Sequence, residues 1–102
     1  MEKDIKEITV IEAYDLISSQ GNLQLIDIRE AAEFKNDSID GFTNIPLSEL
    51  SHHMPELEAR KKILLIDAEG HQSQQAQTML EACGYEPIVI RGGIRDWKKI
   101  VA

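Results

Sequence analysis

Seven consecutive residues in the second half of the chain have the types and spacing of an anion-binding loop. They lie between an apolar run, Ile63–Ile66, and an amphipathic stretch, Gln72–Cys83. The loop consists of Asp67, Ala68, Glu69, Gly70, His71, Gln72 and Ser73. A loop that leads from a strand into a helix directs several backbone N–H groups at one point, where the helix dipole adds partial positive charge. Such a loop suits a bound anion or a thiolate nucleophile, yet its first side chain is itself a carboxylate.

Two regular elements must position this loop. Ile63–Ile66 is a run of four apolar residues, which is typical of a strand buried on both faces of a parallel sheet. The stretch Gln72–Cys83 predicts a helix that ends at Gly84, because glycine favours the left-handed conformation that follows many helices. Four residues at helical spacing are expected to face the sheet, namely Ala76, Met79, Leu80 and Cys83.

Other apolar runs predict the remaining strands of the sheet. They cover Leu23–Ile28, Phe42–Ile45 and Pro87–Ile90, and Ile8 forms either a very short strand or a hydrophobic staple. Strands that alternate with helices indicate an α/β fold with a parallel sheet and right-handed crossovers. We therefore predict one α/β domain over residues 1–102.

The first helix is predicted to begin after Thr9. Thr9 and Glu12 have the spacing of a capping box, in which each residue satisfies a backbone N–H group near the other. The helix should end near Gly21. Its apolar stripe is expected to contain Val10, Ile11, Ala13, Tyr14, Leu16 and Ile17.

Shorter helical segments are predicted between the strands and at the end of the chain. One covers Glu30–Lys35, and a second is capped by Ser48 and reaches His53 or Met54. The terminal helix follows the glycine pair Gly92–Gly93.

Composition and charge exclude several classes of function. With 102 residues, 42% of them hydrophobic and 28% charged, the chain is typical of one small globular domain. A net charge of −7 without a basic run argues against nucleic acid as a partner. No apolar stretch approaches the roughly 20 residues that span a bilayer, and the N-terminal residues lack a signal-peptide core. A single cysteine, Cys83, fits a reducing compartment, so we expect a cytoplasmic protein without a membrane partner.

Three parts of the chain have the residues and the order of known signatures: Leu25–Glu30 with Glu33–Phe34 and Ile39–Leu47, then Ile63–Leu80, then Gly92–Trp97. Together they resemble the rhodanese-like (sulfurtransferase homology) domain family. Leu25–Glu30, with Glu33–Phe34 and Ile39–Leu47 after it, resembles the first signature of the family. Gly92–Trp97 resembles its C-terminal signature, and Ile63–Leu80 resembles its active-site segment. The resemblance implies a mostly parallel five-stranded sheet flanked by helices, with the catalytic loop at the carboxyl edge of the strands.

The resemblance also implies sulfur transfer, but this chain lacks the nucleophile that the reaction needs. Active members place a cysteine first in the loop, and its thiolate takes sulfane sulfur from thiosulfate as a persulfide. Here Asp67 stands at the cysteine position, Glu69 lies within the loop and Gln72 falls where an arginine is common, whereas Gly70 and Ser73 match. A carboxylate forms no persulfide and repels anionic thiosulfate.

These departures predict a catalytically silent domain. The loop N–H groups are expected to satisfy Asp67 itself, so that the protein's own anion fills the loop. We expect a binding or regulatory module linked to sulfur metabolism, whose acidic loop engages a protein partner, with no cofactor and no metal.

Two enzymatic alternatives remain beside this prediction. Cys83 would accept sulfur if it were reactive, but its spacing favours a small core residue. Asp67 would act as a nucleophile in phosphoryl transfer only with a Mg²⁺ site, for which Asp27 is the one plausible helper. A metal site built from Asp67, Glu69 and His71 at alternate positions, with the His52–His53 pair, lacks the usual ligand spacing. A solvated polar loop explains these residues better.

Two positions of the family signatures receive a structural interpretation. Asp27 is expected to satisfy backbone donors at the end of its strand. Arg29 is expected to bond a carboxylate such as Glu33 or one near Asp96. Trp97 is expected to anchor the terminal helix on the sheet.

Overall fold

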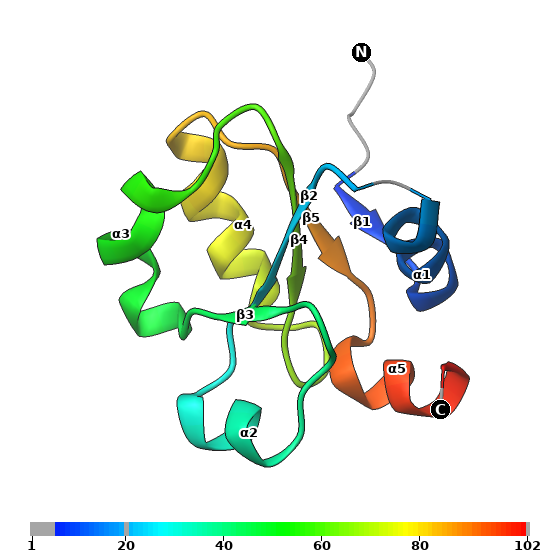
Figure 1. The fold of residues 1–102 in the computed structure, drawn as a ribbon. Helices are drawn as coiled ribbons and strands as arrows, with labels where there is room; N and C mark the ends of the chain where they lie inside the picture. The colour runs from blue at the N-terminus through cyan, green and yellow to red at the C-terminus, as the bar shows by residue number, and fades with distance from the viewer. Residues whose placement is uncertain (1–5, 20, 102) are drawn as a thin grey trace.

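The computed structural model describes residues 6–19 and 21–101 and arranges five strands in one parallel sheet. The strands lie in the order β1-β5-β4-β2-β3, as Figure 1 shows. Their bounds are Glu7–Ile8 for β1, Leu23–Asp27 for β2, Thr43–Asn44 for β3, Lys62–Ile66 for β4 and Pro87–Ile90 for β5. The predicted α/β architecture is confirmed, and Ile8 belongs to a short edge strand.

Helices cover both faces of the sheet. They are α1 (Val10–Ser19), α2 (Ala31–Asn36), α3 (Leu50–His53), α4 (Ser73–Ala82) and α5 (Gly93–Ile100), with 3-10 turns η1 (Leu47–Glu49) and η2 (Met54–Glu56) on either side of α3. Figure 1 places α3 and α4 on one face and α1 and α5 on the other. None of the helices in the described ranges has the length and apolar character needed to cross a membrane.

The central strand β4 owes its position to its continuous apolar run. Each residue from Ile63 to Ile66 is 0% exposed, and β4 pairs with β2 on one side and β5 on the other. Side chains alternate between the two faces of a strand, so Ile63 and Leu65 join one core cluster and Leu64 and Ile66 the other. The apolar run predicted a strand that is buried on both faces, and this prediction is confirmed.

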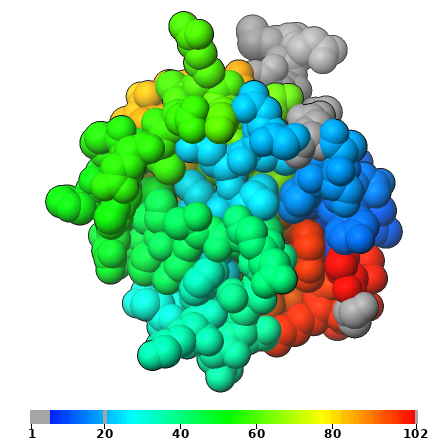
Figure 2. Space-filling model, in the orientation of Figure 1, coloured from blue at the N-terminus to red at the C-terminus, as the bar shows by residue number. Residues whose placement is uncertain are grey.

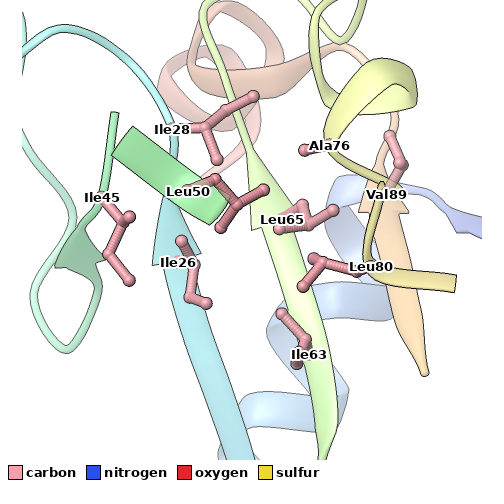
Figure 3. Close-up of a cluster of buried hydrophobic side chains, with 9 residues drawn as sticks. All are labelled: Ile26, Ile28, Ile45, Leu50, Ile63, Leu65, Ala76, Leu80 and Val89. Carbon is pink, nitrogen blue, oxygen red and sulfur yellow. The ribbon is translucent and has the colours of Figure 1, made fainter. Parts of the chain in front are cut away.

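The two core clusters hold the helices against the sheet. Figure 3 shows the first, in which side chains of α3 and α4 meet the sheet, with Ile26, Ile28, Ile45, Leu50, Ile63, Leu65, Ala76, Leu80 and Val89. The second lies under α1 and α5 and contains Val10, Ala13, Phe42, Leu64, Ile66, Ile90 and Ile94. Both clusters reach the carboxyl ends of the strands, where the loop after β4 begins.

The start of α1 is as predicted, but its apolar stripe is narrower. The Thr9 N–H donates to Glu12 Oε1 at 2.8 Å, and the Glu12 N–H donates to Thr9 Oγ1 at 3.1 Å. Ile11 and Tyr14, however, are 57% and 48% exposed. Val10 and Ala13 face the sheet, and residues one position later lie about 100° further round the helix.

Two predicted helix features are wrong. Ser48 caps no helix, because it lies inside η1, a turn that begins after Pro46 and makes no side-chain cap bond. Cys83 is exposed instead of facing the sheet. The helix α4 ends at Ala82, and Cys83 has left helical geometry with φ −103° and ψ 11°.

Tyr85, two residues after Cys83, is partly buried and packs against the core. Its ring packs against the first cluster, and its hydroxyl donates to the Met54 carbonyl oxygen at 2.6 Å. Gly84 has φ +88°, the left-handed conformation predicted for it, which turns the chain back toward the sheet.

Candidate functional site

The loop 67–73 leaves the carboxyl end of the central strand β4, and its last residue, Ser73, is also the first residue of α4. Its neighbour at this edge is the end of β2, because Asp27 is in register with Ile66. In open α/β sheets, ligands bind outside the carboxyl ends of the strands, which makes this edge the candidate site.

The carboxylate of Asp67 fills the interior of the loop. Asp67 is 2% exposed; its Oδ1 accepts a hydrogen bond from the Gly70 N–H, and its Oδ2 accepts one from the Ser73 N–H at 2.8 Å. Ser73 is the first residue of α4, so the carboxylate lies at the positive end of a helix dipole. The loop N–H groups therefore satisfy the protein's own anion, as predicted.

The N-terminus of α5 holds the same loop from the other side. The Ile94 N–H donates to the Asp67 carbonyl oxygen at 2.8 Å, and the Arg95 N–H donates to the Ala68 carbonyl oxygen at 3.0 Å. These contacts were not predicted from the sequence, because they join residues far apart in the chain. The glycine pair Gly92–Gly93 at the start of α5 was the available signal, because a side chain on Gly93 would collide with the loop.

Replacing Gly93 with alanine is expected to lower the free energy of unfolding by at least about 2 kcal/mol. Gly93 has φ +58°, and an added Cβ would lie 2.3 Å from the Asp67 carbonyl oxygen. Urea unfolding followed by circular dichroism measures the loss. The control is Gly21→Ala, where an added Cβ meets no heavy atom within 4 Å and the change should stay within about 0.5 kcal/mol. Equal losses in both variants would contradict the close approach of α5 to the loop.

The outer side of the loop is a shallow acidic depression. It measures about 220 Å³ and is lined by Asp67, Ala68, Glu69, His71 and Gln72. All of these residues except Asp67 are exposed. Beneath the depression, Ser73 is fully buried and its Oγ has no hydrogen-bond partner among the described residues.

Asp27 and Arg29 form a buried ion pair beside the loop. Arg29 Nε lies 3.1 Å and 3.2 Å from the two Asp27 oxygens, and Nη2 lies 2.9 Å from Oδ2. Asp27 Oδ1 also accepts the Arg29 backbone N–H at 2.9 Å, so Asp27 satisfies a backbone donor as predicted. The side chains are 0% and 8% exposed.

The expected partners of Arg29 are wrong. Glu33 Oε1 accepts the Glu30 N–H in the capping box of α2, and Arg95 Nε donates to Asp96 Oδ1 at 3.1 Å. Arg29 follows Asp27 by two residues, and its side chain turns back to the Asp27 carboxylate. The guanidinium therefore has a carboxylate partner without Glu33 or Asp96. Because Arg29 occupies both Asp27 oxygens, Asp27 is not placed to hold a Mg²⁺ ion for Asp67.

The remaining candidate residues are not brought to the loop. His53 Nδ1 lies 3.2 Å from Glu56 Oε1, where α3 passes into η2. The described part of the chain contains no cluster of three or more residues suited to a metal ion. Cys83 follows the opposite end of α4 from the loop, which for a ten-residue helix is a separation of roughly 15 Å. Trp97 packs edge-on against Phe42 and Tyr14, as an anchor of α5 should.

Comparison with known proteins places nearly all of the chain in one family. A profile of the family described as "Rhodanese-like domain" matches residues 9–100. In Bacillus subtilis (strain 168), the protein named "Putative sulfur carrier protein YrkF" is 29% identical over 94 residues, 91% of this chain but only about half (51%) of YrkF. "Putative sulfurtransferase YtwF" of the same organism is 26% identical over 93% of this chain and 92% of YtwF.

Solved structures agree with this placement. The crystal structure of a rhodanese-related protein from Thermoplasma volcanium superposes with a TM-score of 0.84 and 32% identity, over 92% of this chain and 91% of that one. Fold, sequence profile and relatives point the same way: the chain belongs to the rhodanese-like domain family.

Proposed function

We propose that this chain is a rhodanese-like domain without thiosulfate sulfurtransferase activity, which serves in the cytoplasm as a protein-binding module linked to sulfur metabolism. One observation carries the proposal. The carboxylate of Asp67 accepts hydrogen bonds from the Gly70 and Ser73 N–H groups, at the position where sulfur transfer would require a thiolate. In this proposal Asp67–Ser73 is the counterpart of the family's active-site loop.

The chemistry of sulfur transfer explains why Asp67 silences the loop. A thiolate sulfur attacks the sulfane sulfur of thiosulfate, the S–S bond of the donor breaks, and sulfite leaves with the bonding electron pair. A carboxylate oxygen does not yield a persulfide in this step. At a separation of about 6 Å and an effective dielectric near 20, the buried carboxylate also opposes each unit of substrate charge by roughly 3 kcal/mol.

Two features support a role in binding a protein. YrkF is named as a putative sulfur carrier protein and YtwF as a putative sulfurtransferase, which links the proposed module to the handling of sulfur. The exposed side of the loop carries Glu69 on a chain with a net charge of −7, so a partner with a basic surface is favoured.

The wild-type chain is expected to show no thiosulfate:cyanide sulfurtransferase activity above the uncatalysed rate. The measurement is thiocyanate formation, with an active sulfurtransferase of the same fold as positive control. The exposed thiol of Cys83 is the alternative sulfur acceptor, so Cys83→Ser is assayed alongside. Wild-type turnover that Cys83→Ser abolishes would overturn the proposal and assign the sulfur transfer to Cys83.

A further inference from the structure

We propose that a cavity between α5 and the segment after α2 binds an arginine side chain of a partner protein. This inference rests on the proposed function, which requires a protein partner. The cavity measures about 430 Å³, and its lining includes Asp37, Ile39, Asp40, Ile94, Trp97 and Lys98. None of these residues belongs to the loop 67–73. Figure 2 shows the teal segment that contains residues 37–40 against the orange and red of α5.

Trp97 supplies a fixed aromatic surface in this cavity. Its indole ring is half-buried and makes edge-on contacts with Phe42, at a centroid distance of 6.2 Å, and with Tyr14 at 6.3 Å. Because two neighbouring rings hold it, the indole loses little side-chain entropy when a ligand packs on it. A guanidinium group is attracted to an indole by both stacking and the cation–π interaction.

The charges around the cavity favour a cation. Lys98 forms an ion pair with Asp37, so these two charges compensate each other. The carbonyl oxygen of Asp37 accepts a hydrogen bond from Arg29 Nη2 at 2.5 Å, which ties this wall to the buried ion pair. Asp40 is exposed and, within the described ranges, its carboxylate has no hydrogen bond or ion pair. One uncompensated carboxylate therefore remains for a ligand.

Arginine fits this combination better than other ligands do. Its planar guanidinium can donate two parallel hydrogen bonds to the Asp40 carboxylate and pack on Trp97. Its methylene stem can lie along Ile39 and Ile94, which supply apolar walls. An anion would meet the uncompensated charge of Asp40, and a lysine ammonium lacks the flat surface that stacks on an indole.

The test is a titration of the full chain with a blocked Gly-Arg-Gly peptide. Trp97 is the only tryptophan, so its fluorescence reports binding at the cavity directly. A saturable change in the millimolar range is expected, with amide shifts in ¹H–¹⁵N spectra at Ile39, Asp40 and Ile94. The matched peptide carries citrulline, which has the shape of arginine without its charge, and should bind roughly tenfold more weakly or not at all.

Two variants distinguish binding of the peptide at the cavity from general attraction of the peptide to an acidic protein. Asp40→Asn should weaken binding of the arginine peptide roughly threefold to tenfold. Asp15→Asn removes the same charge from the exposed face of α1 and should leave the affinity unchanged. Equal binding of the two peptides, equal effects of the two variants, or no saturable signal would each overturn the assignment.

Failure of this assignment is distinguishable from failure of the proposed function. The silent loop is judged by thiocyanate formation, which does not involve the cavity. An absent peptide signal with an inactive wild type removes the arginine partner alone, whereas wild-type turnover removes the proposed function whatever the peptide does.

Discussion

Replacing Asp67 with cysteine is expected to give the chain sulfurtransferase activity that the wild type lacks. The Gly70 and Ser73 N–H groups, with the N-terminus of α4, would then stabilise a thiolate and lower the pKa of the introduced thiol. That thiolate can take the sulfane sulfur of thiosulfate and release sulfite. The measurements are thiocyanate formation and, by mass spectrometry without cyanide, the gain of one sulfur atom.

The introduced thiol must be distinguished from the natural one. The experiment is therefore made in a Cys83→Ser background, where the added sulfur can lie only at position 67. Adding Glu69→Gln should raise kcat/KM about threefold to tenfold, because an exposed carboxylate beside the site repels thiosulfate. A folded variant whose thiol takes up no sulfur would show that the loop is not a sulfur-transfer cradle.

Most of the fold could be predicted because its signals are local. The apolar run Ile63–Ile66 marks a strand buried on both faces, and the spacing of Thr9 and Glu12 marks a helix start, whatever else the chain does. The side of α1 that faces the core is not a local property. Ile11 and Tyr14 continue the helical spacing, but the sheet and α5 receive Val10 and Ala13 instead.

The candidate site could be predicted only as far as one loop and its own helix. Asp67 and the N–H groups that hold it lie within seven residues, so the sequence indicates the contact. The bonds from Ile94 and Arg95 to the loop need the packing of α5, which no short motif specifies. Cys83 is exposed because α4 ends at Ala82 and Cys83 itself is not helical. The spacing of apolar residues does not show at which residue a helix ends.

Replacing Asp27 with alanine is expected to lower the free energy of unfolding by about 3–5 kcal/mol. The change leaves the guanidinium of Arg29, which is 8% exposed, without its carboxylate. Urea unfolding measures the loss, and the double variant Asp27→Ala with Arg29→Met tests its cause. Because the second change removes the unpaired charge, the double variant should be more stable than Asp27→Ala alone.

The position of this pair explains why its loss should reach beyond one contact. The Asp27 carbonyl oxygen accepts the Ile45 N–H at 2.9 Å and Asn44 Nδ2 at 3.0 Å, while Arg29 holds the Asp37 carbonyl. The Arg29 side chain thus ties the end of β2 to the segment after α2, beside the backbone bonds that join β2 to the residues of β3. In Asp27→Ala, amide shifts at positions 37–45 should accompany the loss of stability. A loss below about 1 kcal/mol without those shifts would show that the pair is dispensable to this edge of the sheet.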